Sequence, residues 1–481
     1  MNNKDENTHM KNNLENTHVN IKDKNTSEQN IVILVVIITA FITTFTGSAL
    51  NLSIPDIGEQ FGVSANFVGW LVTGYTLAVA AFSVPIGRVA DITCRKTVLV
   101  TGLVIFVACC IAAVFAVSMV MLLMVRIIQG IGAAMIFSTN TAILVSCFPA
   151  DMRGRVLGYS IAATYTGLSA GPVIGGFLNH NLGWKSIFIL TGVLGAVALA
   201  AAVLKLPADR TESSGRSPDA AGNIIFIAFI IMVMYGLSEL GSGAANDVII
   251  AVILTAAGLL LGVLFVRHEL KSDDPAVDVR LFGKNAGYAF SNLSALLNYS
   301  ATFAISYLIS IYLQVVMGYS SQTAGLIMIF QPIVMAVLSP AAGRLSDRLS
   351  PFKMSSAGMG LCALGSGIFI FIGQDTGLAV IIVALLITGL GFSLFSSPNT
   401  NAVMSCVDKE DYGVASSILA TMRSIGHTLS MVIVTIIVSR YMGDMPLTGA
   451  DPQTLVSVIN TSFIIFTVIC GAGVFISLKR K

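Results

Sequence analysis

The sequence predicts an all-α protein that crosses a membrane about fourteen times, and three observations carry this prediction. Of its 481 residues 55% are hydrophobic and only 11% are charged, whereas a soluble domain carries roughly 25% charged residues. Apolar runs of about 18 to 25 residues, long enough to cross roughly 30 Å of hydrocarbon, recur along the chain. Lys and Arg gather in alternate connections between these runs. This composition excludes an ordinary soluble enzyme.

The expected helices form two blocks of six with a pair between them. The first six lie near residues 31–54, 67–86, 97–117, 120–145, 156–178 and 185–204. The central pair lies near 222–240 and 246–266. The last six lie near 286–315, 323–341, 355–373, 377–397, 412–439 and 455–478. We therefore divide the chain into a tail (1–30), a first half (31–205), an inserted pair with its linkers (206–285) and a second half (286–481).

The tail and the loop charges predict how the chain sits in the membrane. Residues 1–30 are polar and rich in Asn, so they bury too little apolar surface to fold and we expect disorder. The connections on the tail's side hold nearly all the loop Lys and Arg, and the opposite side holds only Lys185 and Arg440. Because Lys and Arg remain on the cytoplasmic side, both termini are predicted to be cytoplasmic in a multi-pass protein of a prokaryotic plasma membrane.

Several function classes have no support in the sequence. The net charge of +2 gives no basic face for a nucleic acid. The seven cysteines are scattered through apolar segments, which predicts packing roles and no metal site. There is no G-x-x-x-x-G-K-[ST] loop for a nucleotide. We expect no enzyme activity and no cofactor, and a transport process would have to draw its energy from a gradient.

A five-residue pattern occurs twice, each time after the second helix of a six-helix block. Gly87–Asp91 reads Gly-Arg-Val-Ala-Asp, and Gly343–Asp347 reads Gly-Arg-Leu-Ser-Asp. This repetition predicts two duplicated halves, an architecture of many secondary transporters whose substrate site lies where the halves meet. Residues 206–285 are then an insertion between the halves.

These and other motifs resemble the major facilitator superfamily, and within it the fourteen-helix drug:proton antiporters of the multidrug efflux branch. The matching residues of helix 2 and its following loop are Trp70, Tyr75, Pro85, Gly87, Asp91, Arg95 and Lys96. Those of helices 4 and 5 are Arg126, Gln129, Gly130, Gly132, Gly167, Gly171, Pro172, Gly175 and Gly176. The resemblance implies a transporter that alternates between inward-open and outward-open states. It also implies export of hydrophobic or amphipathic compounds, including antibiotics, in exchange for protons.

The loop motif is interpreted as a conformational latch. Asp91, Arg95 and Lys96 lie at cytoplasmic helix ends, where they can bridge neighbouring helices. The alternative is that the cations only orient the chain, but an acidic residue among them adds nothing to orientation. Gly343 and Asp347 would form a second latch, weaker because residues 350–352 replace the later glycine and basic positions of the family pattern.

Arg126 and Gln129 lie inside the fourth helix, and a glycine stripe lies on the fifth. An unpaired guanidinium in hydrocarbon costs about 2.5 to 3.5 kcal/mol on insertion scales, so Arg126 should face a partner or a wet cavity unless it snorkels from the helix end. The resemblance implies a role in proton transfer for the position of Arg126.

On the fifth helix, Gly167, Gly171 and Gly175 recur every four residues beside Pro172, which predicts a tight, bendable seam or ordinary helix packing.

Two polar stripes are expected to line a central cavity. The first helix carries Thr44, Ser48 and Asn51, and the ninth carries Asn298, Thr302, Ser306 and Ser310. The alternative is that these side chains bond back to their own helices. Thr46 stands where related drug exporters often carry an aspartate, so the carboxylate that would titrate there is missing.

Two residues remain as candidates for the proton-linked group. Arg423 and His427 are four residues apart on the thirteenth helix, hence on one face, and histidine titrates near neutral pH. Glu239 is the acidic residue expected well inside an apolar segment and is the rival carrier. A neutral histidine bonded to a backbone carbonyl is the structural alternative.

Two rivals to a proton-coupled exporter remain open on the sequence. One is a metabolite importer or an uncoupled facilitator, favoured by the scarcity of carboxylates within the helices. The other is a membrane sensor that transports nothing and uses the inserted pair and the tail to bind partners. The expected partners of the transporter are a small-molecule substrate, protons and the lipid bilayer, without nucleic acid or nucleotide.

Overall fold

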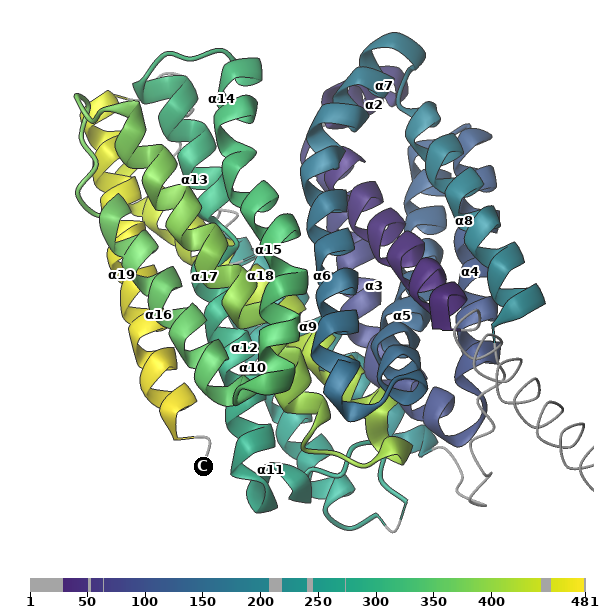
Figure 1. Ribbon diagram of the computed structural model, residues 1–481. Helices are drawn as coiled ribbons and strands as arrows, with labels where there is room; N and C mark the ends of the chain where they lie inside the picture. The colour runs from purple at the N-terminus through teal and green to yellow at the C-terminus, as the bar shows by residue number, and fades with distance from the viewer. Residues whose placement is uncertain are drawn as a thin grey trace, which may run out of the picture.

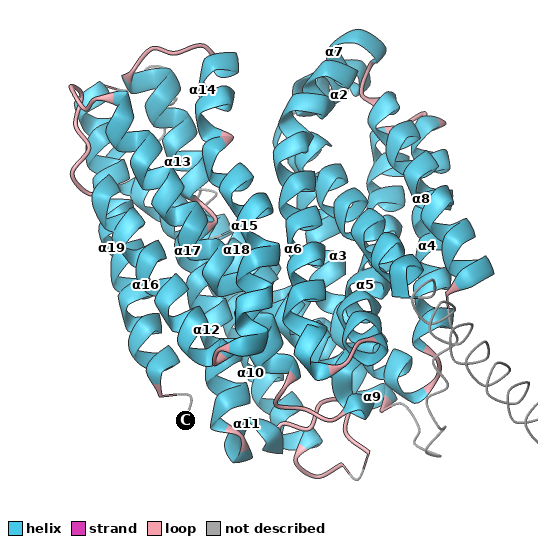
Figure 2. Ribbon diagram, viewed as in Figure 1, coloured by secondary structure: helices cyan, strands magenta, loops and turns pink. Residues whose placement is uncertain are grey.

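The computed structural model describes residues 29–50, 53–63, 65–206, 219–239, 245–272, 274–442 and 451–479. These residues are almost entirely helical and contain no strand (Figure 2), which confirms the predicted fold class. Nearly all of the tail, Asn51 and most of the linker before residue 219 lie outside the described residues.

The helices follow one another closely along the chain. The first half contains Gln29–Leu50, α2 (Ile54–Phe61), α3 (Ala65–Ile92), α4 (Arg95–Val114), α5 (Met119–Cys147), α6 (Arg153–Ala170), α7 (Gly176–Leu182) and α8 (Lys185–Lys205). The central pair is α9 (Ala220–Glu239) and α10 (Ala245–Glu269). After it come α11 (Arg280–Lys284), α12 (Ala286–Thr302), α13 (Ile305–Ile311), α14 (Ser321–Met328), α15 (Phe330–Arg348), α16 (Pro351–Phe369), α17 (Leu378–Met404), α18 (Tyr412–Met442) and α19 (Pro452–Leu478).

Among the described residues, twelve helices are long and apolar enough to cross a membrane, or thirteen if a bent pair counts as one span. The bent pair, Ala150–Ala170 with Val173–Leu182, covers the span expected near 156–178. The span expected near 355–373 forms as α16 but is not one of the twelve, because Lys353 and several serines and glycines reduce its apolar character. Each of the fourteen expected spans corresponds to helix in the described part of the chain, and twelve of them, or thirteen with the bent pair, are long and apolar enough to cross a membrane.

The helices form two bundles that stand side by side (Figure 1). One contains α3, α4, α5, α6 and α8, and the other contains α12, α15, α16, α17 and α19. The bundles meet where α18 packs on α3 and α5 and where α6 packs on α15. The hairpin of α9 and α10 packs through α9 on α3 and α18.

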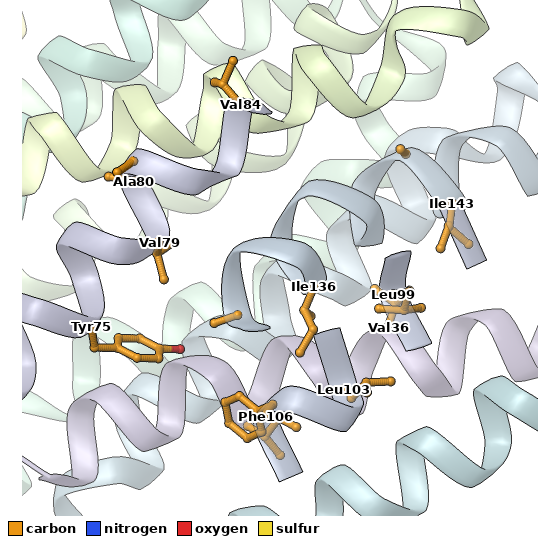
Figure 3. Packing of buried hydrophobic residues seen from close by; sticks show 14 of the residues in the cluster. Val36, Tyr75, Val79, Ala80, Val84, Leu99, Leu103, Phe106, Ile136 and Ile143 are labelled. Carbon is orange, nitrogen blue, oxygen red and sulfur yellow. The ribbon is translucent and has the colours of Figure 1, made fainter. Parts of the chain in front are cut away.

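Apolar side chains fill the bundles and also cover much of their outer surface. Figure 3 shows part of the first bundle's core, where Val79 of α3, Phe106 of α4 and Ile136 of α5 lie among other buried side chains. Leu204 of α8 and Phe475 of α19 are 77% and 72% exposed. Outward-facing apolar side chains on long helices are what a lipid bilayer accommodates.

Candidate functional site

Asp91, in the last turn of α3, caps the start of α18. Its Oδ1 accepts a hydrogen bond from the backbone N–H of Gly413, and its Oδ2 accepts one from Val414, both at 2.8 Å. The first N–H groups of a helix have no partner within the helix, and the helix dipole favours a negative charge beside them. Arg95 donates to Asp91 Oδ1 from Nε (3.1 Å) and Nη2 (2.8 Å) and also to the carbonyl oxygen of Lys409. The carboxylate therefore joins the two bundles.

Asp347, in the last turn of α15, makes the equivalent contact with α6. Its Oδ1 accepts a hydrogen bond from the N–H of Gly154 at 2.6 Å, and its Oδ2 accepts one from Arg155 at 2.9 Å. These donors belong to the first turn of α6. The two copies of the repeated pattern thus bind the two bundles to each other twice.

The glycine four residues before each aspartate lets the helix backbones touch. A Cβ at Gly87 would lie 2.7 Å from the carbonyl oxygen of Gly413, and one at Gly343 would overlap the carbonyl oxygen of Gly154. Any side chain at either position would hold the bundles apart. We call the end of the molecule at which α3 and α15 end and α6 and α18 begin the closed end; it lies at the bottom of Figure 1.

Tyr412 connects the two capped turns and was not identified from the sequence. Arg95 and Arg153 lie on its ring, with guanidinium carbons 5.8 and 5.7 Å from the centroid, and Arg153 opens the turn of α6 that Asp347 caps. An aromatic residue at the start of a helix carries no sequence signal for such a contact, because it depends on how the bundles dock.

Lys96 lies apart from the contact between the bundles. Its Nζ donates to the carbonyl oxygens of Leu206 (2.6 Å) and Val203 (3.3 Å) at the end of α8. A cation at a helix carboxyl end is favoured by the helix dipole. Lys96 therefore ties α4 to α8 within one bundle, whereas Asp91 and Arg95 reach across to the other.

A cavity of about 60 Å³ lies between the bundles, next to the closed end. Its wall comes from Gln29–Leu50, α5, α6, α12, α17 and α18. The lining residues are Ala40, Phe137, Asn140, Thr141, Leu157, Ser160, Ile161, Thr164, Tyr299, Ser396, Thr400, Ser416, Leu419, Ala420 and Arg423. Arg423 is eleven residues after Tyr412, about 16 Å along the helix at 1.5 Å per residue. This depth is near the middle of a bilayer core of roughly 30 Å.

Hydroxyl and amide groups surround this cavity. Asn140 and Thr39 are hydrogen-bonded to each other, with Nδ2 of Asn140 3.0 Å from the Thr39 hydroxyl. The hydroxyls of Tyr165 and Tyr299 each lie 3.3 Å from Oγ of Ser396. Asn140 and Tyr165 were not identified from the sequence. Asn140 stands within an apolar run, which is the one signal that could have marked it.

Arg126 and Gln129 form a pair inside the first bundle, away from the cavity wall. The side chain of Arg126 is fully buried. Its Nε donates to the carbonyl oxygen of Leu71 at 3.2 Å, and its Nη1 donates to Oε1 of Gln129 at 2.6 Å. The guanidinium carbon lies 4.3 Å from the ring centroid of Tyr75, and Nη2 has no hydrogen-bond partner among the described residues. The partners of Arg126 are therefore neutral groups.

Several residues expected along the pathway bond to their own helices instead of facing the cavity. The Thr46 hydroxyl donates to the carbonyl oxygen of Ile42 at 2.6 Å, and Thr302 donates to that of Asn298 at 2.7 Å. The amide of Asn298 is buried, and neither of its polar atoms has a partner among the described residues. None of these three side chains lines the cavity.

The structure separates the residues considered for proton coupling. The imidazole of His427 stacks on Phe303 with centroids 4.1 Å apart and meets Tyr299 edge-on at 5.4 Å, while Arg423, one turn earlier, lines the cavity. Glu239 is the last residue of α9, so it lies at a helix end, four residues after Tyr235. His427 thus contacts a residue that lines the cavity, Tyr299, whereas Glu239 is not part of the cavity wall.

The glycine stripe of α6 and the segment after it packs against Gln29–Leu50. A Cβ at Gly171 would lie 2.5 Å from Cβ of Ser48, and one at Gly175 would lie 2.5 Å from Cβ of Ala49. Gly167 is equally close, 2.6 Å from the carbonyl oxygen of Phe41. Gly171–Gly175, which includes Pro172, forms a π-helical turn where the axis bends by 40°.

Comparisons with known proteins give consistent matches over most of the chain. The sequence profile of the Major Facilitator Superfamily matches residues 36–431. Riboflavin transporter RibZ of Clostridioides difficile is 28% identical over 83% of this chain and 86% of the relative. Drug efflux pump JefA of Mycobacterium tuberculosis is 29% identical over 89% of this chain and 84% of the relative. The crystal structure of the human organic anion transporter MFSD10 superposes with a TM-score of 0.63 at 16% identity and covers 92% of this chain and 99% of that one.

Proposed function

The chain belongs to the major facilitator superfamily, and from this membership we propose that it exports hydrophobic or amphipathic organic compounds across the plasma membrane in exchange for protons. Members of this family are multi-pass membrane transporters and not enzymes. The observation that carries the proposal is the pair of aspartate caps that close one end beneath a cavity lined by both bundles. Efflux is supported by the names of JefA and of Multidrug resistance protein Stp of Mycobacterium tuberculosis, which is 29% identical over 82% of this chain.

We further propose that the closed end faces the cytoplasm and that both chain termini lie on that side. The closed end carries many cations, among them Arg88, Arg95, Lys96 and Arg153, as expected of cytoplasmic loops. The conformation described here is then outward-facing. Loading from the cytoplasm requires the two carboxylates to leave the starts of α18 and α6, after which the cavity opens on that side.

Proton exchange is assigned in this proposal to His427. Histidine is a titratable side chain, and the imidazole of His427 contacts Tyr299, which also lines the cavity. Arg423 lies one turn away on the same helix, so a proton on His427 and a substrate in the cavity would influence each other electrostatically.

The main alternative is a metabolite importer or an uncoupled facilitator. Two observations favour it: Thr46 stands where related drug exporters often carry an aspartate, and one relative is named a riboflavin transporter. A membrane sensor that transports nothing is the alternative of another class.

Transport by the purified protein in lipid vesicles separates these functions. The vesicles are loaded with a panel of fluorescent amphipathic dyes and studied with and without an imposed pH gradient. A proton antiporter accumulates a dye against its gradient only when the pH gradient is present. A facilitator moves dyes only downhill, whichever pH gradient is imposed, and a sensor moves none, so either result rejects the proposal.

A further inference from the structure

The cavity between the bundles contains one charged side chain. Of its lining residues only Arg423 is ionised, and no carboxylate belongs to the described wall. The remaining polar groups are hydroxyls and one side-chain amide, that of Asn140. The one charge on the described wall of the cavity is therefore positive.

The guanidinium of Arg423 is not neutralised by the protein. Among the described residues it makes no ion pair, and its guanidinium carbon lies 5.3 Å from the centroid of the Phe137 ring. Arg95, in contrast, is paired with Asp91, and two nitrogens of Arg126 donate hydrogen bonds. An arginine side chain has five N–H donors, so Arg423 keeps donors that a ligand in the cavity could use. A cation left without a counter-charge at mid-membrane depth is costly.

Aromatic rings and hydroxyls complete the wall. Phe137 and Tyr299 line the cavity from opposite bundles, and Tyr165 lies behind them with its hydroxyl on Ser396. Flat rings of this kind favour a ligand that is itself aromatic. The present cavity is far smaller than the roughly 300 to 1,000 Å³ of drug-sized sites. It must therefore widen as the bundles separate, and each bundle would carry part of this wall with it.

We propose that the substrate class is an amphipathic aromatic anion whose acidic group binds Arg423. This inference rests on the proposed function, because it takes the cavity to be the substrate site. A carboxylate or similar group can accept two parallel hydrogen bonds from a guanidinium, and it supplies the missing negative charge. A cationic compound would place two positive charges together in a poorly hydrated cavity and is excluded by repulsion.

Binding of two dyes that share a ring system tests this inference. 5-Carboxyfluorescein is anionic at neutral pH and rhodamine 6G is cationic, and both are xanthenes whose fluorescence anisotropy reports binding to the purified full chain. The wild type is expected to bind the anionic dye at least tenfold more tightly than the cationic one. Arg423→Gln should weaken binding of carboxyfluorescein at least tenfold and remove the preference, while Arg423→Lys should retain part of it.

Arg440→Gln is the matched control, since Arg440 is on the same helix, exposed and near its other end. It should bind both dyes as the wild type does, and the thermal unfolding of all variants in detergent checks that they fold. Equal binding of both dyes, tighter binding of rhodamine 6G, or no binding of either dye by folded wild type overturns the anion assignment. So does unchanged carboxyfluorescein binding by Arg423→Gln.

Transport of the same dyes in vesicles distinguishes failure of this inference from failure of the proposed function. If rhodamine 6G is transported and Arg423→Gln has no effect on it, the transporter stands and the anion assignment falls. If carboxyfluorescein binds through Arg423 but neither dye crosses the membrane, the binding chemistry stands and the transport function falls.

Discussion

At the scale of single residues, two carboxylates cap helix starts in equivalent positions but accept different numbers of hydrogen bonds. Asp91 accepts hydrogen bonds from two backbone N–H groups and from Arg95. Asp347 accepts two from α6, and Pro351 stands where the first copy of the motif has Arg95. The first cap is therefore expected to contribute more to the stability of the closed end.

Asp91→Asn should shift the equilibrium towards the state in which the closed end is open. A charge-assisted hydrogen bond contributes about 1.5–3 kcal/mol, so loss of one corresponds to about a tenfold to hundredfold change in this equilibrium. Asp347→Asn should have a smaller effect, because no side-chain ion pair is lost with it. Labelling of a cysteine placed near the closed end, measured from the cytoplasmic side, reports the change. A larger effect of Asp347→Asn would contradict this ranking.

His427→Gln should uncouple transport from the pH gradient while preserving downhill movement of substrate. Glutamine keeps hydrogen-bonding capacity but cannot titrate. Glu239→Gln is the matched comparison, because Glu239 lies at the end of α9 and is expected to leave coupling intact. The measurement is dye accumulation in vesicles at imposed pH gradients. If the histidine variant still concentrates the dye and the glutamate variant does not, the proton carrier is Glu239.

The sequence indicates which residues are important more readily than it indicates which residues they contact. Asp91 and Asp347 were found because their motif repeats, but their partners are backbone N–H groups of Gly413, Val414 and the start of α6, which leave no side-chain pattern. Thr46 has a polar side chain in an apolar run whether it faces a cavity or its own helix. The direction in which Thr46 points, and so its hydrogen bond to the Ile42 carbonyl oxygen, depends on how the helix Gln29–Leu50 is rotated about its axis in the bundle.

At the scale of helices, hydrophobic runs predicted where the helices lie but not where they break. The run near 286–315 contains no helix-ending residue, yet α12 ends at Thr302 and α13 begins at Ile305. At this break the N–H of Ala304 donates a hydrogen bond to Oγ of Ser430 on α18, a partner that the local composition does not indicate. The bend at Gly171–Gly175 was predicted more readily, since Pro172 supplies no N–H to the helix.

Gly343→Ala should prevent α15 from approaching α6 and should weaken transport. The added Cβ would overlap the carbonyl oxygen of Gly154, and backbone cannot move aside as a flexible side chain can. Gly360→Ala on α16 is the control, because nothing lies within 4 Å of a Cβ there. Initial rates in vesicles should fall at least tenfold for the first variant and stay within twofold for the second. Equal rates would show that the close contact of α6 and α15 is dispensable.

At the scale of the whole molecule, we propose that the two bundles part at the closed end and expose the cavity there. The sequence predicted two halves and a site between them from the duplicated motif. It could not indicate the cavity wall, because Phe137, Ser160, Ser396 and Arg423 come together only when the bundles dock. The hairpin of α9 and α10 packs through α9 on α3 and α18, the two helices whose contact changes in the proposed transport cycle.

The most direct test of this account is a distance measurement across the closed end. Spin labels are attached at Lys205 and Lys353, which are exposed and lie at that end of opposite bundles, in a variant whose seven native cysteines are replaced. Pulsed electron paramagnetic resonance should give a main short distance and a minor longer one. Asp91→Asn should enrich the longer distance, as should conditions that favour loading from the cytoplasm. A single distance that stays the same in wild type and in the Asp91→Asn, Asp347→Asn double variant would contradict the account.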